Sequence, residues 1–194
     1  MKQYAWIAAA FALPMLVYGA NQEDLQKLLE LKEKPATHLD LSNADLRDYH
    51  FAPGKIDLQN ANLSHSNLAG VDLSKMNLSG ADLSYANVSH AKLNQTNLTG
   101  ANLDHAILTG AELQQSDLSR ATLTAANLTQ AKLQQAILTK ANLTCANLNQ
   151  ADLTQANFSD ANITGASLIN TITNGVIGYS YIDKTPVNCE GLMK

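Results

Sequence analysis

The sequence is short of aromatic residues, of charge and of cysteine. Only 5% of its 194 residues are Phe, Trp or Tyr, and 15% are charged, against about 25% charged in an average soluble domain. Two cysteines are too few for a small disulfide scaffold or a four-thiolate zinc site. With 13 Lys and Arg against 17 Asp and Glu, the chain lacks the basic excess of nucleic-acid-binding domains. Ten glycines and four prolines exclude collagen and Gly/Pro-rich disorder.

The first twenty residues have the order of a secretory signal peptide. A positive start at Lys2 is followed by an apolar run from Ala5 to Val17 and by the small residues Gly19 and Ala20. The run is shorter than the roughly 20 residues of a membrane-spanning helix. We expect cleavage near Ala20, export to the periplasm or beyond, and no membrane anchor afterwards. An uncleaved N-terminal anchor is the alternative.

Five-residue repeats organise most of the remaining chain. From Ile56 to Asn170 it divides without a gap into 23 units such as Ala81-Asp82-Leu83-Ser84-Tyr85. The third place is Leu in 20 units and the first is Ala in 17, while the second is mostly Asn or Asp. A five-residue step scatters these apolar places around a helix and alternates them between the faces of a flat strand. The conflict disappears if the chain bends in the same sense once per unit, which winds stacked coils around an apolar core.

The A(D/N)LXX repetition resembles the pentapeptide repeat proteins, over about three-quarters of the chain beyond residue 20. The resemblance implies an all-β fold: a right-handed, four-sided parallel β-solenoid with four units in each coil. Residues twenty apart then stack at about 4.8 Å. The leucines expected to fill the solenoid core include Leu63, Leu83, Leu103, Leu113, Leu123 and Leu143.

Both ends of the repeat depart from it. Three earlier units cover 39–53, and two extra residues at the Pro53-Gly54 corner shift the register within 52–57. The leucines of 21–38 have helical spacing, which predicts a short N-terminal capping helix and linker. The repeat is lost after Asn170. The expected organisation is therefore a signal peptide at 1–20, the helix and linker at 21–38, the solenoid at 39–170, and an irregular C-terminal cap at 171–194.

Columns of residues twenty apart are the candidate sites on the outer surface. A second-place column alternates in charge, which favours exposed ion pairs worth about 0–1 kcal/mol each, with a recognition stripe as the alternative; its members are Asp72, Lys92, Glu112, Lys132 and Asp152. A fifth-place column contains His65, Tyr85, His105, Ala125 and Cys145. Its two histidines would lie about 9–10 Å apart, too far to share a metal ion. Another fifth-place column, with stacked amides that can hydrogen-bond, contains Gln95, Gln115, Gln135 and Gln155.

No enzyme motif accompanies these columns. The sequence has no GxSxG, HExxH, phosphate-binding loop or CxxC, and the repeat places its carboxylates on convex faces rather than in a cleft that would perturb their pKa. We therefore predict no enzyme and no catalytic, cofactor-binding or metal-ligating residue. Export would allow a disulfide between Cys145 and Cys189; two free thiols are the alternative.

The expected function is that of an exported, non-enzymatic scaffold for a protein or other envelope partner. Tyr179 and Tyr181 suit a homodimer formed through the C-terminal cap, because interfaces are enriched in aromatic residues. We expect no nucleic-acid partner and no cofactor. The resemblance supplies an alternative, because some pentapeptide repeat proteins mimic DNA, bind DNA gyrase and protect it from quinolones. That role needs a strongly acidic rod, whereas 56–170 contains eight acids and five interleaved bases.

Overall fold

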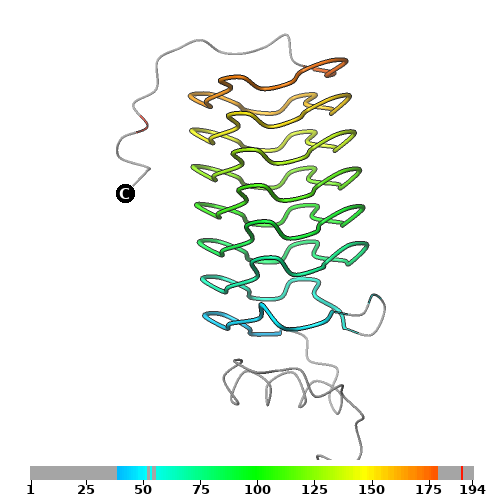
Figure 1. Cartoon of the computed structure of the whole chain (residues 1–194), viewed down its shortest axis with the longest axis vertical. Helices are drawn as coiled ribbons and strands as arrows, with labels where there is room; N and C mark the ends of the chain where they lie inside the picture. Colours follow the sequence, from blue (N-terminus) through cyan, green and yellow to red (C-terminus); the bar gives the residue numbers. More distant parts are fainter. Residues whose placement is uncertain (1–38, 52, 54–55, 179–188, 190–194) are drawn as a thin grey trace, which may run out of the picture.

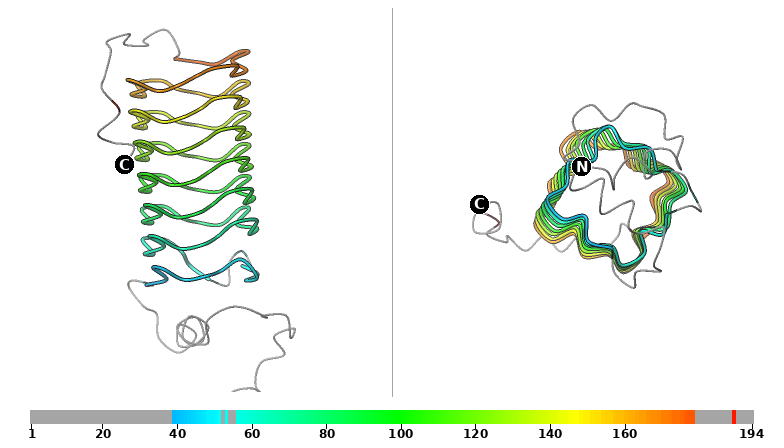
Figure 2. Two further views of the ribbon diagram at one scale, coloured as in Figure 1. Left: turned by 60° about the vertical axis from the view of Figure 1, so that its left-hand side comes forward. Right: turned by 90° about the horizontal axis from the view of Figure 1, so that it is seen from below.

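The chain winds into a rod of stacked coils in the computed structural model, which describes residues 39–51, 53, 56–178 and 189 (Figure 1). Seen along its length, the coils superpose on one closed outline (Figure 2). No helix occurs in this described part of the chain, and the signal peptide and capping helix expected within 1–38 lie outside it. The prediction of an all-β solenoid is confirmed.

Parallel pairing between single residues holds the coils together. From Asn62 onward each second-place residue forms isolated parallel bridges, and the pairs run in a continuous series from Asn62↔Asp82 to Asn157↔Ile177. The offset of these bridges is always 20 residues, so that one coil consists of four five-residue units. Longer strands do not form, because the chain turns after every unit.

One unit, 81–85, illustrates how each backbone N–H group finds a hydrogen-bond acceptor. The N–H groups of its second, third and fifth residues donate to carbonyl oxygens of neighbouring coils at 2.7–2.9 Å. The N–H of its first residue closes the preceding turn at 3.0 Å. The remaining N–H, that of Ser84, donates to the Asp82 carboxylate at 3.0 Å. Asn or Asp suits the second place because its short side chain accepts this hydrogen bond two residues on.

The fifth place of each unit requires a left-handed backbone. Every fifth-place residue from Asn60 to Gly175 has a positive φ, between 53° and 74°. The third-place carbonyl accepts a hydrogen bond from the next first-place N–H, as in Ala86 to Leu83 at 3.1 Å. A hydrogen bond between residues three apart, with a positive φ at the residue before the donor, closes a β-turn in each unit. Most fifth-place residues are not glycine, so the stacked pairing holds them in a conformation that L-residues disfavour.

The core contains the first and third places, as the repeat predicts. Third-place residues from Leu58 to Phe158 are at most 2% exposed. Most first places are Ala, and three others are buried hydroxyl residues. These hydroxyls donate to backbone carbonyls at 2.7–2.9 Å, and the residues are Ser66, Thr96 and Ser116.

The bridges also locate the two irregular regions. Asp40↔Asn62 and Asp45↔Asn67 are offset by 22 residues instead of 20, which places two extra residues between these coils. At the other end the solenoid extends past Asn170, where the loss of the repeat predicts its boundary. Ile172 and Ile177 still bridge to the preceding coil. The backbone pattern persists there because Gly175 supplies the positive φ of the fifth place, at 68°.

Candidate functional site

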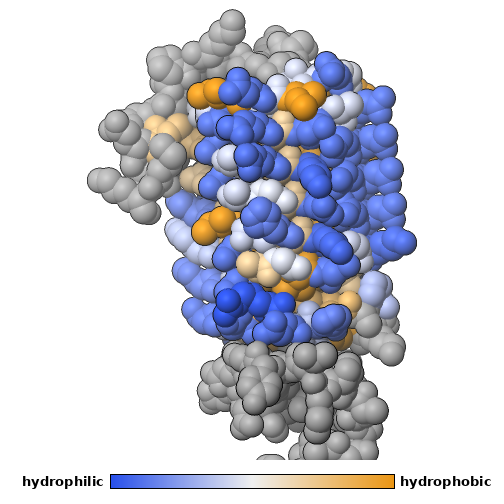
Figure 3. Space-filling model, in the orientation of Figure 1, coloured by the Kyte–Doolittle hydropathy of each residue, from blue (hydrophilic) through white to orange (hydrophobic). Residues whose placement is uncertain are grey.

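The outer surface of the rod consists mainly of polar side chains arranged in columns. Figure 3 shows these hydrophilic columns along one side, with separate apolar patches between them. Since second-, fourth- and fifth-place side chains point away from the core, each face repeats its chemistry at every coil. Any functional site in the described residues is therefore built from columns or from a break in them.

The charge column, which is Asp72, Lys92, Glu112, Lys132 and Asp152, forms alternating ion pairs. Lys132 Nζ lies 2.9 Å from Glu112 Oε1, and Lys92 Nζ lies 3.9 Å from Asp72 Oδ2. Hydrogen bonds from Lys132 and then Asn94 lower the pKa of Glu112. Hydrogen bonds from the Ser74 side chain and backbone lower the pKa of Asp72, and Lys92 and His50 add to the effect.

The last carboxylate of the column is bonded differently. Asp152 accepts a hydrogen bond from Gln134 Nε2 at 2.7 Å and from Thr154 N–H at 3.0 Å. Burial acts to raise the pKa of Asp152, but these bonds and one from the Thr154 hydroxyl together outweigh it, so that the pKa is lowered. Hydrogen bonds from neighbouring polar groups, together with the lysines at Asp72 and Glu112, therefore favour the ionised form of these three carboxylates, as a structural column would.

The histidines of the fifth-place column stack on the intervening tyrosine. The ring centroids of His65 and Tyr85 are 5.0 Å apart, those of Tyr85 and His105 are 4.8 Å apart, and the planes are nearly parallel. His105 Nδ1 also lies 2.8 Å from Asp104 Oδ2. In this arrangement the Tyr85 ring separates the histidines. No group of three or more His, Cys, Asp or Glu within the described ranges could hold a metal ion.

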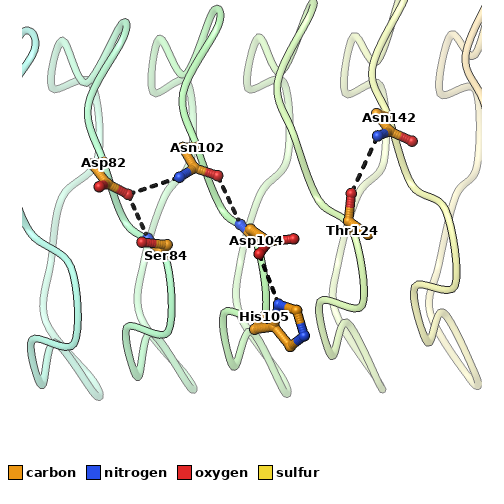
Figure 4. A network of polar contacts seen from close by, with 7 residues as sticks. All are labelled: Asp82, Ser84, Asn102, Asp104, His105, Thr124 and Asn142. Atoms are coloured by element: carbon orange, nitrogen blue, oxygen red, sulfur yellow. Dashed lines mark hydrogen bonds and ion pairs between the residues drawn. The ribbon is translucent and has the colours of Figure 1, made fainter. Parts of the chain in front are cut away.

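Side-chain hydrogen bonds join neighbouring coils on the face beside this stack (Figure 4). Asn102 Nδ2 donates to Asp82 Oδ1 at 3.0 Å, and Asn142 Nδ2 donates to the Thr124 hydroxyl at 3.2 Å. The glutamine column behaves similarly, with amide-to-amide bonds of 2.9–3.1 Å that link Gln95, Gln115, Gln135 and Gln155 in order. These bonds use the side-chain polar groups to join one coil to the next.

The two cysteines form a disulfide in the structure. Cys145 and Cys189 are joined with an S–S distance of 2.07 Å and a Cα–Cα distance of 5.7 Å. Cys145 is buried at 4% exposure, and Cys189 Sγ lies 3.7 Å from the carbonyl oxygen of Gly165 in the coil above. The bond closes a loop over a sequence separation of 44 residues and fixes residue 189 against the side of the rod.

A cleft of about 570 Å³, which the repeat pattern does not predict, lies beside the two-residue insertion. We name it the corner cleft. Its lining includes the aromatic residues Tyr49 and Phe51. The ionisable lining residues besides tyrosine are Arg47, His50, Asp72, Lys75 and Lys92. The signal that could have found it was the register shift itself, because an insertion in a regular rod interrupts the columns around it.

No helix in the described part of the chain combines the length and apolar character needed to cross a membrane.

Comparison with known proteins places the repeat in one family. Residues 56–95, 89–124, 121–160 and 136–175 match the family described as Pentapeptide repeats (8 copies). No enzyme family was found, and no curated protein matches the chain.

Solved structures support the same assignment. HetL is a pentapeptide repeat protein involved in heterocyst differentiation regulation from the cyanobacterium Nostoc sp. strain PCC 7120. It is 33% identical with a TM-score of 0.63, and the match covers 74% of this chain. That match spans 63% of HetL, which is less than two thirds of its length.

Two further structures are more distant. Rfr23, from the cyanobacterium Cyanothece 51142, is 25% identical with a TM-score of 0.46, over 80% of this chain and 97% of its own. QnrB1, a plasmid-mediated fluoroquinolone resistance protein, is 17% identical with a TM-score of 0.48, over 66% of this chain and 68% of its own. From the family match, which covers more than half of its length, the chain belongs to the pentapeptide repeat family.

Proposed function

We propose that the protein is an exported, non-enzymatic scaffold that binds a protein partner on the outer surface of its rod. The observation that carries this proposal is the rigid, polar outer surface. Its side chains are held by bonds between coils, such as Lys132 to Glu112 at 2.9 Å and Gln95 to Gln115 at 2.9 Å. Ordered side chains lose little further entropy when a partner binds, which favours recognition.

Export is supported by the disulfide and by the order of residues in 1–20. Disulfides persist in oxidising compartments such as the bacterial periplasm and are rare in the cytosol. The bond between Cys145 and Cys189 also attaches the C-terminal region to the rod, which suits a protein outside the cell's reducing interior. The alternating charge column likewise differs from the strongly acidic surface that a DNA mimic needs.

The proposal includes the finer architecture that the family implies. We expect the solenoid to be right-handed and four-sided, the short capping helix within 21–38 to cover the first coil, and residues beyond the last coil to cover the other end. Capping of this kind is generally required for solenoids to remain soluble.

Fractionation of expressing cells, followed by N-terminal sequencing of the recovered protein, tests export. We expect a chain that begins near Ala20 or Asn21 and is found outside the cytoplasm. A full-length chain confined to the cytoplasm would contradict the proposal and favour the gyrase-binding alternative. A full-length chain held in the membrane fraction would instead indicate an uncleaved anchor.

A homodimer formed through the C-terminal end is a second part of the proposed interaction. Ile169, Ile172 and Ile177 are 63%, 47% and 58% exposed on the last described coil. Exposed apolar residues grouped at one end suit an interface between two copies; Tyr179 and Tyr181 lie outside the described residues. Sedimentation equilibrium should show a dimer that Ile172→Asp weakens. A monomer at all accessible concentrations would contradict this part.

A further inference from the structure

The corner cleft has an apolar floor and a charged rim. Val71 is 2% exposed and Phe51 is 7% exposed, and Tyr49 packs partly buried against the core. The rings of Tyr49 and Phe51 meet edge to face with centroids 4.6 Å apart. Lys75 and Lys92 stand at the rim as exposed side chains. The cleft beside the insertion is thus lined by a partly exposed tyrosine that packs on a buried phenylalanine, next to the regular columns.

The charge of the cleft is opposite to that of the rod. The described residues contain eleven Asp and Glu against six Lys and Arg. Three of those six bases line the cleft, but only one of the eleven acids does. Exposed charges act mainly within about 10 Å. An anionic group near the cleft would therefore respond to its local positive charge and not to the acidic rod as a whole.

The three bases are not equally available to a ligand. Arg47 already binds Asp45 through both Nε and Nη2, at 2.8 Å and 2.6 Å. Lys75 makes no ion pair within the described part of the chain, and Lys92 is 3.9 Å from Asp72, the outer limit of such a pair. The two lysines therefore supply the positive charge of the cleft. A lysine ammonium acts as a point charge and, unlike the planar arginine guanidinium, does not require a ligand with two oxygens in a fixed geometry.

These features identify the class of ligand. A pocket for a small molecule buries 70–90% of its ligand, whereas most of the charged lining residues here are exposed. A nucleic acid needs a longer basic stripe than two lysines provide. We propose that the corner cleft binds an acidic peptide segment of a partner protein, with an apolar or aromatic side chain against Tyr49 and flanking carboxylates at Lys75 and Lys92. This inference rests on the proposed scaffold function and specifies the partner's chemistry.

Fluorescence anisotropy with a labelled peptide, Glu-Glu-Phe-Glu-Glu, tests this proposal on the purified full chain with its disulfide intact. Lys75→Gln and Lys92→Gln should each weaken binding by about two- to five-fold, the range of an exposed charge pair. The matched controls should bind as the wild type does. Lys140→Gln removes a fifth-place lysine with φ of 61°, close to the 63° of Lys75. Lys132→Gln removes a lysine of the same charge column as Lys92, two coils away.

A variant that is expected to strengthen peptide binding makes the test sharper. Asp72 competes with the peptide for Lys92, so Asp72→Asn should strengthen binding by a similar factor. Asparagine retains the backbone hydrogen bond from Ser74, as Asn97 does with Thr99 at 3.0 Å. Because these side chains are exposed, circular dichroism should show that all five variants remain folded.

Three results would overturn the inference. One is equal binding of Gln-Gln-Phe-Gln-Gln, which would show that carboxylates are not recognised. Another is an equal loss of binding in the cleft variants and in the controls, or no saturable binding at all. The third is displacement of the peptide by inorganic phosphate at an ionic strength where chloride has no effect, which would indicate a phosphate site. If an envelope partner is cross-linked elsewhere on the rod while the peptide fails to bind, the scaffold function stands and only this inference fails.

Discussion

Placing a carboxylate at a third place is the strongest test of how the repeat folds. Leu123 is 0% exposed in the middle of the core, whereas its neighbour Thr122 points outward at a second place. Leu123→Asp removes a buried leucine, which costs about 2–5 kcal/mol. It also buries a carboxylate without a partner, with a penalty of several kcal/mol more even after relaxation. The total is at least about 5 kcal/mol, comparable with the whole stability of many domains.

The matched variant Thr122→Asp introduces the same side chain one residue earlier. Asp is common at this place, where it accepts the fourth-place N–H, as Asp82 does from Ser84 at 3.0 Å. We expect a change within about 0.5 kcal/mol. Urea unfolding followed by circular dichroism measures both variants. A Leu123→Asp protein with the wild-type midpoint, or two variants equally destabilised, would refute the inward placement of the third residue.

Three further predictions follow from the turns, the charges and the disulfide. Ala125→Gly should raise the free energy of unfolding by about 0.5–1 kcal/mol, since Ala125 has φ of 53°; the same change at buried Ala126 should lower it, and equal effects in thermal melts would contradict the turn assignment. Stability should fall as pH drops below the ordinary carboxyl values of 3.8 for Asp72 and 4.5 for Glu112. Because folding lowers the pKa of both groups, these carboxylates contribute fully to stability above their ordinary pKa values, and the contribution is lost as the folded groups protonate. Glu112→Gln should flatten the dependence of the free energy of unfolding on pH, measured by urea unfolding, and an unchanged dependence would contradict the role of the ion pair. Cys189→Ser should lower the free energy of unfolding by about 3–4 kcal/mol relative to the disulfide-bonded wild type, from loop entropy. Thermal melting measures this loss, the reduced wild type is expected to melt like the variant, and a variant as stable as the bonded wild type would contradict the prediction.

The regular part of the rod could be predicted because one local rule repeats. Leu63 and Leu83 occupy equivalent places, and the odd period excludes both a straight helix and a flat strand. The second-place Asn and Asp were recognised as outward residues, but their hydrogen bond to the fourth-place N–H became clear only in the structure. A spacing pattern shows where a side chain points and does not show its bonding partner.

The cleft and the C-terminal boundary were harder to predict for different reasons. Pro53 and Gly54 marked an extra turn, yet the space between Tyr49 and Lys75 depends on how two coils with different registers pack. The solenoid passes Asn170 because backbone pairing at Ile172 and Ile177 needs no consensus side chain. Hydrogen bonds between coils can therefore continue after the sequence repeat has been lost.

Trapping the thiols of the protein in intact cells tests the proposed export and the disulfide together, because disulfides persist in oxidising compartments and are rare in the cytosol. Cells are quenched in acid, and free thiols are alkylated before and after reduction. We expect Cys145 and Cys189 to be labelled only after reduction, since the two are bonded in the structure. Labelling of both residues without reduction, in protein at its native location, would contradict this expectation.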